Sequence, residues 1–404
     1  MELYYYVALA AIFTQLVFLV QMYRNYHYVL SKYHKKRTKF KPKTILIIPC
    51  KGLDAKFENN IASFFNLDYE DYLLWFVVAD ENDPAYAKLC QLKNKLAAHS
   101  KAYDIRVLLA GQATSCSQKV HNLLYAYNQI TDDIEVLAFA DSDICVRRDW
   151  LSHLLYPLRK ETNGAASGYR WFIPQRNNLP TLVLSAINAK IAQLLGSYSY
   201  VQAWGGSMAI RVNVFRRTGL HEIWQKAVSD DLSLSYAVKK AGLRIVFVPA
   251  CLVGSYVKTN WSELFEFARR QFLITRITAP GTWWFGLFSS LYSILGLWGG
   301  AVIAVCAAFI DEPNLPLFTA VPILFFAGHL WRSVLRQRMI ARLLKDDLPR
   351  MRFAMAADIL GSWLYSPLLL FFILSSAVGR TISWRGIRYK LLSPTETIVE
   401  STES

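Results

Sequence analysis

The chain has 404 residues, of which 53% are hydrophobic, and a formal net charge of +15. This length allows a domain with a full core plus additional elements, and an apolar yet basic chain favours contact with membranes. Nucleic acid is not an expected partner, because no binding motif accompanies the charge. The six cysteines are scattered, without the spacing of a zinc site or a disulfide framework, so reduced thiols are expected.

The first apolar run, Leu3 to Met22, begins with tyrosines and has the length of a membrane span. We therefore predict a transmembrane helix over residues 1–23. A signal peptide is disfavoured, because no basic segment precedes the run and no small-residue cleavage site follows it.

A basic linker without acids follows, over residues 24–43. It includes Lys32, Lys35, Lys36, Arg37, Lys39, Lys41 and Lys43. Such a run indicates the cytoplasmic side of a membrane and places the N-terminus outside. Contact with anionic lipid head groups is a second possible role for the same charges.

Apolar strand-like runs then alternate with helical segments. The predicted strands are Thr44–Pro49, Leu73–Ala79, Ile105–Ala110 and Val136–Ala140. The predicted helices are Phe57–Asn66, Ala85–Ala98, Lys119–Ile130 and Asp149–Arg159. This alternation predicts an α/β domain with a mostly parallel sheet that helices cover on both faces.

Acidic residues follow two of these strands. Val136–Ala140 ends on Asp141-Ser142-Asp143, and Leu73–Ala79 is followed by Asp80. Ligands of open α/β sheets bind past the carboxyl ends of the strands, where two carboxylates can share a divalent cation that holds a diphosphate. Alone, the Asp-Ser-Asp motif is equally typical of a turn or a helix start.

The second half of the domain adds glycines and a further acidic pair. Strands are expected at Ala165–Phe172 and Leu243–Val248, and an apolar helix over 179–195 belongs either to the core or to the membrane surface. The paired glycines after Trp204 indicate a tight turn or a close approach to a ligand. Ser229-Asp230-Asp231 begins a helix, as a cap or as acids that face the other clusters.

The C-terminal part is membrane-like. Apolar runs over Trp283–Ile310, Leu315–Leu330 and Phe353–Val378 are candidate spans, and the basic segment Arg332–Arg352 between the last two is expected to be cytoplasmic or interfacial. An amphipathic helix is expected over Trp261–Ile277, before the first of these runs.

Four full spans from an outside N-terminus would place the tail outside, whereas its charges favour the inside. These charges are Arg380, Arg385, Arg388 and Lys390. We therefore expect one segment to be re-entrant or interfacial, and Phe353–Val378 is the candidate because it contains Asp358 and Pro367. From Ser393 onward the polar tail is expected to be frayed.

Seven stretches carry a resemblance to a known family. In order they are PCKGLDAKFENNIASFFNLDYEDY, VVADENDPA, QKVHNL, FADSDICV, WGGSMAIR, SDDLSLSYAVKKAGLR and ISWRGIRYKL. Together they resemble the inverting family 2 glycosyltransferases of the GT-A (nucleotide-diphospho-sugar transferase) fold, and more closely the ceramide glucosyltransferase branch, family 21. The resemblance covers nearly the whole chain, and its strength lies in the order of motifs that are individually only moderately specific.

The resemblance implies an integral, multi-pass membrane enzyme that moves a sugar, with glucose expected, from a UDP-sugar to ceramide or a related lipid with inversion. It implies a GT-A catalytic domain over residues 44–260 on the cytoplasmic side, an interfacial helix over 261–281 and a transmembrane region over 282–379. Residues 380–404 would form a basic, then polar, cytoplasmic tail.

The resemblance also implies roles for individual residues. The nucleotide side would consist of Lys51, Gly52, Asp80, Lys119, Asn122 and Asp141. Asp141 and Asp143 would hold Mg²⁺ or Mn²⁺ on the diphosphate, and Asp231, supported by Asp230, would be the general base. The acceptor or diphosphate side would consist of Trp204, Gly205, Gly206, Arg270, Gln271 and Arg276.

The chain departs from the family at one motif. The family usually carries (Gln/Arg)-x-x-Arg-Trp after the third acid, whereas here Ile274 and Thr275 follow Gln271 at the Arg and Trp positions. Two alternative functions remain open. One is a processive polysaccharide synthase, but such an enzyme usually has more spans and the intact motif, so both features count against it. The other is a non-catalytic membrane scaffold that keeps the fold, which the altered motif favours.

Overall fold

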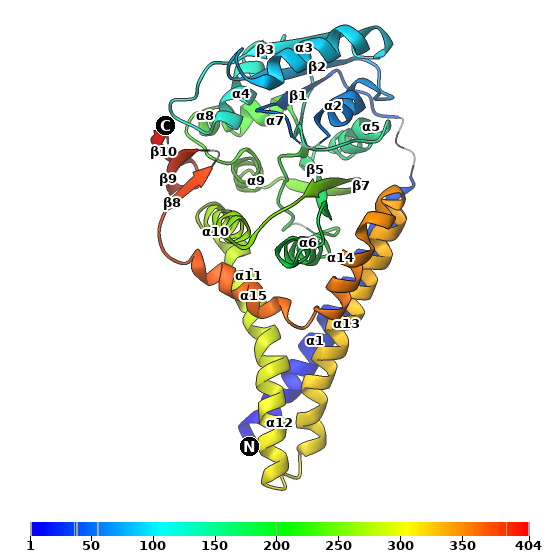
Figure 1. Ribbon diagram of the computed structural model, residues 1–404, viewed down its shortest axis with the longest axis vertical. Coiled ribbons are helices and arrows are strands. Elements are labelled where there is room, and N and C mark those ends of the chain that lie inside the picture. The colour runs from blue at the N-terminus through cyan, green and yellow to red at the C-terminus, as the bar shows by residue number, and fades with distance from the viewer. Residues whose placement is uncertain are drawn as a thin grey trace.

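A computed structural model describes residues 2–35, 37, 39–54, 56–198, 200–384 and 386–402 (Figure 1). Lys36 and Arg385, named among the basic residues above, lie outside the described residues. Figure 1 shows an α/β domain at one end and a narrow bundle of long helices at the other, with the N-terminus at the far end of the bundle.

The α/β domain is built on a seven-stranded sheet with the order β3-β2-β1-β4-β6-β5-β7. Its strands are β1 (Thr44–Pro49), β2 (Tyr72–Val78), β3 (Asp104–Leu109), β4 (Val136–Ala140), β5 (Asn163–Pro174), β6 (Ser207–Arg211) and β7 (Arg244–Val257). Strands β1 to β4 pair in parallel, as do β5 and β7, and only β6 runs antiparallel to its neighbours. The predicted mostly parallel sheet is therefore confirmed.

Burial on both faces explains why the central strands are continuous apolar runs. All seven residues of β2 are buried. Side chains alternate across the sheet, so Ile45 and Ile47 of β1 pack in one core cluster while Leu46 and Ile48 pack in the other. The helices that cover the two faces are α2 (Phe57–Phe65), α3 (Pro84–Leu96), α4 (Gln118–Tyr127), α5 (Trp150–Leu155), α6 (Leu179–Ala192), α7 (Val212–Arg217), α8 (Leu220–Trp224) and α9 (Asp230–Lys240).

Three helical segments are long and apolar enough to cross a membrane. They are α1 (Glu2–Tyr33), the continuous stretch Pro280–Phe309 and α13 (Leu315–Leu343). The second consists of α11 (Pro280–Ile294), one π-helical turn and α12 (Gly300–Phe309). Large apolar side chains of these helices are exposed, among them Phe13, Phe288 and Phe309 at 69%, 60% and 85%, as expected for surfaces that face lipid.

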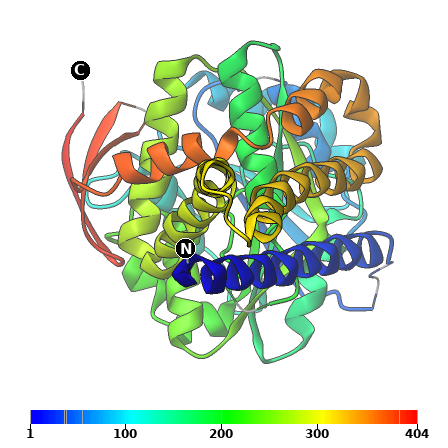
Figure 2. The same cartoon turned by 90° about the horizontal axis from the view of Figure 1, so that it is seen from below.

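The fourth apolar run is broken. It forms α14 (Leu348–Leu360) and α15 (Tyr365–Ser375), and the helical stretches over 345–360 and 365–375 meet at an angle of 91°. Figures 1 and 2 show α14 running beside the domain end of α13, whereas α15 lies across the bundle. The bend agrees with the expectation that Phe353–Val378 is re-entrant or interfacial, since Pro367 in the first turn of α15 cannot continue a helix from α14.

The segment Arg332–Arg352, which the sequence predicted to be cytoplasmic or interfacial, continues from α13 into α14. Helix α13 runs on to Leu343, and Arg332 and Arg336 are buried rather than solvated. Arg336 Nε lies 2.6 Å from Asp358 Oδ2 on α14, and the second pair of atoms, Nη2 and Oδ1, is also bonded. The position of the segment at a membrane stays a prediction, and its burial was not expected because a carboxylate partner 22 residues away cannot be recognised from local charge density.

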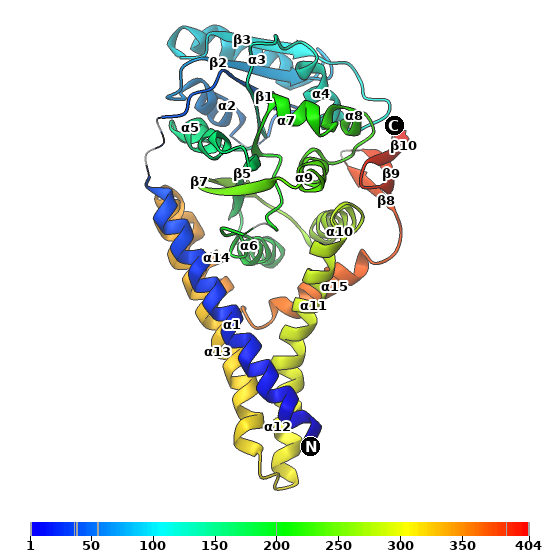
Figure 3. The same cartoon turned by 180° about the vertical axis from the view of Figure 1, so that it is seen from behind.

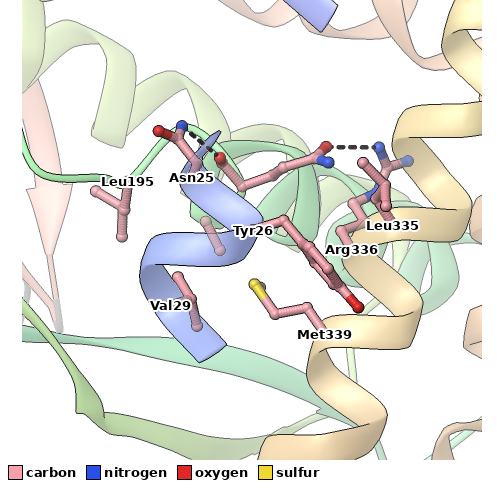
Figure 4. Close-up of a pocket in the computed structure, with 9 residues that line it drawn as sticks. Asn25, Tyr26, Val29, Leu195, Leu335, Arg336 and Met339 are labelled. Carbon is pink, nitrogen blue, oxygen red and sulfur yellow. Dashed lines mark hydrogen bonds between the residues drawn. The ribbon is translucent and has the colours of Figure 1, made fainter. Parts of the chain in front are cut away.

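Helices α1 and α13 join the α/β domain through a buried polar contact (Figure 4). Asn25 on α1 donates to the backbone oxygen of Gln193 at 3.1 Å, and Arg336 on α13 donates to Gln193 Oε1 at 3.3 Å. Val29 and Met339 line the same junction, and the gap between them does not admit a water molecule. The domain is therefore packed directly on the helices that could span the membrane.

The tail is ordered where the sequence predicted fraying. It forms an antiparallel sheet of β8 (Thr381–Trp384), β9 (Ile387–Ser393) and β10 (Glu396–Thr402). Ile382, Tyr389 and Leu391 of this sheet pack against Leu273 and Ile274 of α10 (Trp261–Thr278). Alternating apolar residues from Ile382 to Leu391 supply this packing face. The sequence analysis predicted fraying because most residues after Ser393 are polar.

Candidate active site

A lysine and two acids from three separate elements form the centre of the candidate site. Lys119 lies in the first turn of α4, Asp141 directly follows β4, and Asp230 begins α9. Lys119 Nζ lies 2.7 Å from Asp141 Oδ1 and 2.9 Å from Asp230 Oδ2. The structure therefore brings together the second and third acidic motifs that the sequence identified, with Lys119 between them.

Local sequence explains how α4 and α9 present these side chains. Ser117 caps α4 by accepting from Val120 N, and Ser229 caps α9 by accepting from Leu232 N at 3.2 Å. Each helix thus begins at the carboxyl edge of the sheet. Asp230 and Asp231 occupy the first turn of α9, where the helix dipole favours negative charge.

Asp231 has different surroundings from Asp230. Its Oδ1 accepts hydrogen bonds from Ser229 Oγ at 2.5 Å and Leu232 N at 2.7 Å, and its Oδ2 accepts from Gly205 N at 3.0 Å. Asp231 is only partly buried, whereas Asp230 is 3% exposed. Of the two, Asp231 is the carboxylate held in a fixed orientation near the surface.

Glycine is required at both positions after Trp204 because neighbouring side chains lie too close for a Cβ atom. A Cβ on Gly205 would lie 2.3 Å from Asp230 Oδ2 and 2.7 Å from Lys119 Nζ. A Cβ on Gly206 would lie 2.7 Å from Asp141 Oδ2 and closer still to the Trp204 ring. The turn therefore lies directly against the acid–lysine cluster, which accounts for the glycine pair without invoking an unusual backbone conformation.

The electrostatics of the cluster are dominated by burial. Burial raises the pKa of Asp230 to about 6, against the lowering effect of Lys119 and with the added repulsion of Asp231 and Asp141. Burial alone would lower the pKa of Lys119, but Asp141, Asp230 and Asp231 together hold it above its usual value. Lys119 is therefore a permanent cation among several acids.

Asp143 is the residue that fits a metal ion best. Burial raises its pKa to about 6, Asp141 adds repulsion, and Arg170 opposes both effects. Its Oδ1 is buried and has no hydrogen-bond partner among the described residues, and its Oδ2 has only Ser255 Oγ at 3.5 Å. An orphaned carboxylate oxygen beside a second carboxylate matches the donor set of a hard divalent cation.

No group of three or more His, Cys, Asp and Glu side chains is placed to hold a metal within the described ranges. Two carboxylates are nevertheless sufficient for Mg²⁺, which commonly takes its other ligands from water and substrate phosphates. Asp141 and Asp143 thus remain the candidate ligands.

The predicted nucleotide side lies along the same edge of the sheet. Asp80 follows β2, Lys51 and Gly52 follow β1, and β1 lies between β2 and β4. Asp80 is exposed and accepts from Asn82 N at 2.8 Å, while Gly52 N donates to Asp83 Oδ1 at 2.8 Å. The topology places these residues beside Asp141, as parallel strands require.

Asn122 has a structural explanation of its own. It is buried on α4, and its Nδ2 donates to the backbone oxygen of Val77 near the end of β2 at 3.2 Å. This bond fixes α4, and with it Lys119, against the sheet edge.

The residues predicted on α10 point to the tail. Arg270 Nη1 donates to Ser383 O at 3.4 Å, and Arg276 donates to the backbone oxygens of Ala377 and Gly379. Gln271 is exposed. These bonds of Arg270 and Arg276 tie α10 to the segment that follows α15.

Two residues near the site escaped the sequence analysis. Arg170 on β5 lies with its guanidinium carbon 5.7 Å from the Trp204 ring and acts electrostatically on Asp143. Asp54 accepts from Ser142 Oγ at 3.1 Å and so ties the loop after β1 to the Asp-Ser-Asp motif. A basic residue inside the apolar strand GYRWFIP was the signal that could have identified Arg170.

A mostly parallel sheet with acids and a lysine at the carboxyl ends of its strands is the architecture of the sugar-transferring class that the motifs resemble. The family model described as Glycosyl transferase family 21 matches residues 3–397, which is nearly the whole chain. The chain therefore belongs to this family, and it is a hexosyltransferase with a GT-A-type fold.

Similar solved structures are also glycosyltransferases. A mannosyltransferase from Pyrobaculum calidifontis in complex with GDP-Man and Mn²⁺ has a TM-score of 0.45 at 14% identity, covering 91% of this chain and 97% of its own. Glucosyl-3-phosphoglycerate synthase from Mycobacterium tuberculosis, with Mn²⁺ and UDP-glucose, has a TM-score of 0.37 at 15% identity, covering 57% of this chain and 77% of its own. At these low TM-scores we draw nothing further from the likeness.

Proposed function

We propose that the protein transfers a hexose, most simply glucose, from a UDP-sugar to a hydroxyl group of a membrane lipid such as ceramide, with inversion. The observation that carries this proposal is the placement of Asp231 and the Lys119–Asp141–Asp230 cluster in a domain packed directly on three apolar helices. Family membership supplies the reaction class.

Asp231 is the proposed general base. Three hydrogen bonds hold its carboxylate in place, and partial exposure leaves it accessible to an acceptor hydroxyl. A positioned base of this kind contributes ~10²- to 10⁴-fold to the rate. Asp230 has the supporting role, because it is buried against Lys119 and fixes the position of that cation.

Lys119 is proposed to compensate the charge of the donor diphosphate, with Arg170 as the further cation near Asp143. Asp141 and Asp143 would hold a Mg²⁺ or Mn²⁺ ion, which when bound neutralises a leaving diphosphate. Lys51, Gly52 and Asp80, at the ends of β1 and β2, are the proposed contacts of the nucleotide.

The acceptor is proposed to reach the site from the membrane surface. Helices α6 and α10 lie between the sheet and the long helices, and α15 lies across the bundle below them (Figures 1 and 2). The basic residues at the end of α1 and in the following linker support a cytoplasmic position for this side of the membrane.

The test is UDP release by the purified full-length protein in nanodiscs. UDP-glucose, UDP-galactose and UDP-N-acetylglucosamine are each supplied with Mg²⁺, Mn²⁺ or EDTA, with and without ceramide, diacylglycerol or a total lipid extract. We expect metal-dependent release that increases with one lipid, and a product with one sugar on that lipid.

Two outcomes would contradict the proposal. A long polymer as product would favour the processive synthase instead. No release with any donor, from protein shown to be folded by its thermal unfolding transition, would contradict the assigned reaction.

A further inference from the structure

A basic pocket lies on the α/β domain away from the acid–lysine cluster. It has a volume of about 310 Å³, at the low end of the ~300–1,000 Å³ typical of small-molecule sites. It forms where the end of α1 and the following linker meet the turn after α5 and the first half of β7. Figure 3 shows α1 running up from the bundle toward the side of the domain that carries α5.

The lining of the basic pocket is strongly cationic. Its five Lys and Arg residues are Lys32, Lys35, Arg37, Arg159 and Lys160, and no Asp or Glu is among the lining residues. None of these five forms an ion pair with any residue that the structure describes. Five cations held around one hollow repel each other, and an anion in the pocket would relieve this repulsion.

The two arginines are pre-positioned by one aromatic ring. The guanidinium carbon of Arg37 lies 4.3 Å from the centroid of the Tyr156 ring, and that of Arg159 lies 3.8 Å from the same centroid. Arg159 Nη1 also donates to the backbone oxygen of Tyr156 at 3.1 Å, which holds the group in place. Stacking leaves the remaining N–H groups of the two guanidinium edges available to a phosphate. The ring thus reduces the entropy that would be lost when an anion binds.

Asp149 lies beside the lining residue His153, and its charge is already compensated. It lies 3.6 Å from His153 Nδ1, a lining residue, but it also accepts from Arg147 Nε at 3.0 Å and Nη2 at 2.8 Å. It therefore does not neutralise the five cations.

The basic pocket is distinct from the catalytic site. Val246 to Pro249 line it from the first half of β7, whereas Asp143 faces Ser255 near the far end of the same strand. Seven residues of extended strand, from Val248 to Ser255, correspond to about 20 Å. A ligand in the basic pocket would therefore not occupy the donor position.

We propose that the basic pocket binds a phosphate-bearing anion with more than one negative charge, as a site separate from the donor site. Two sources share this chemistry: the head group of an anionic lipid and a soluble polyphosphate. Basic pockets beside the cytoplasmic end of a membrane span are suited to lipid head groups.

The test is calorimetric titration of the full-length protein in an uncharged detergent. The probes are pyrophosphate, inositol 1,4,5-trisphosphate, dioctanoyl phosphatidylinositol 4,5-bisphosphate and dioctanoyl phosphatidylserine. We expect saturable binding of one molecule of a multiply phosphorylated probe, weakened by added salt. Tighter binding of pyrophosphate than of both inositol probes identifies a soluble polyphosphate, and tighter binding of the phosphoinositide lipid than of pyrophosphate and the trisphosphate identifies a lipid head group.

Two variants test whether the lining carries the binding. Arg37→Gln/Arg159→Gln removes the stacked guanidinium groups, and Lys35→Ala/Lys160→Ala removes two exposed cations that do not stack, so that it leaves the packing intact. Each should weaken binding at least about tenfold, because charge-assisted bonds to phosphate are lost.

The matched control is Arg217→Ala/Lys240→Ala, which removes the same charge from exposed positions outside the pocket. Its affinity should equal that of the wild type, and transferase activity without probe should be unchanged in all variants. An equal loss of affinity in the control, or no saturable binding of any probe, would overturn the proposal, since the charges would then act only as a topology signal.

Discussion

The protein contains two buried clusters of charged residues, and they differ in the sign of their excess charge. At the sheet edge, Lys119 is surrounded by Asp141, Asp143, Asp230 and Asp231, so acids outnumber cations. At the junction with the long helices, Lys190, Arg332 and Arg336 surround the single acid Asp358.

The two clusters also differ in how completely their polar atoms are paired. Both oxygens of Asp358 are bonded to Arg336, and Gln337 donates to Oδ2 at 2.6 Å, whereas Asp143 Oδ1 has no partner within the described residues. A saturated buried pair holds structure together, and an unsaturated acid is available to a ligand. Charge burial alone therefore does not distinguish the two clusters, whereas the pairing of their carboxylate oxygens does.

The largest expected effect is on catalysis at the sheet edge. Asp231→Asn should lower kcat by ~10²- to 10⁴-fold, because the amide cannot accept the proton of the acceptor hydroxyl. The thermal unfolding midpoint and UDP binding should change little, since the amide oxygen can still accept from Gly205 N. The control Asp132→Asn removes a carboxylate that is 96% exposed and should leave kcat unchanged. Wild-type turnover in Asp231→Asn would exclude this residue as the base.

A substitution at the junction with the long helices should lower stability and leave activity unchanged. Asp358→Asn leaves the Arg336 charge buried without its counterion, which should cost ~3–5 kcal/mol of stability. We expect a clear fall in the unfolding midpoint in nanodiscs, with activity per folded molecule retained. The double variant Arg336→Met/Asp358→Leu should recover most of the midpoint. An Asp358→Asn protein that is stable but inactive would show that the junction takes part in catalysis.

Crowding of the Gly205 turn should have an intermediate effect. Gly205→Ala places a Cβ against Asp230 and Lys119, and such overpacking costs ~1–3 kcal/mol. A loss of about tenfold in kcat/KM is expected, measured by UDP release. Gly281→Ala is the matched control, because a Cβ there meets nothing within 4 Å. Equal kinetics in the two variants would show that the turn tolerates displacement.

The smallest expected effect is on the pH dependence of stability. The pKa of Asp230 is raised from 3.8 to about 6 by burial, so the folded protein binds this proton more tightly than the unfolded chain. Wild type should therefore gain stability relative to Asp230→Asn as the pH falls from about 6 to about 4. Unfolding midpoints of both proteins at pH 4.5 and 7.0 measure this difference. A difference that is constant with pH would show that Asp230 stays ionised throughout.

Local patterns were sufficient to predict the parallel half of the sheet. Val136–Ala140 has the predicted bounds, and β1 to β3 lie within one residue of theirs, because β1, β2 and β4 are buried apolar runs and the half-buried edge strand β3 is also an apolar run bounded by polar or glycine residues. The motif order also predicted that Lys119, Asp141 and Asp230 belong to one site, and the structure places Lys119 Nζ 2.7 Å and 2.9 Å from the two carboxylates.

Long-range pairing was not predictable in the same way. The burial of Arg332 and Arg336 depends on Gln193 and Asp358, which lie far away in the sequence, so this burial could not be predicted from the Arg-rich stretch itself. The last strand, β10, consists mainly of polar residues and exists because β9 offers it a hydrogen-bonding edge. In both cases the structure is determined by the partner rather than by the segment itself.

The packing of the C-terminal sheet on α10 bears on how many times the chain can cross a membrane. Because β8 to β10 pack on α10, the described C-terminal residues lie at the domain end of the molecule, whereas α1 starts at the far end of the bundle (Figure 1). If the bundle spans a bilayer, chain ends on opposite sides require an odd number of crossings. The three straight helical segments would satisfy this requirement, and in that arrangement the bent pair of α14 and α15 would not cross.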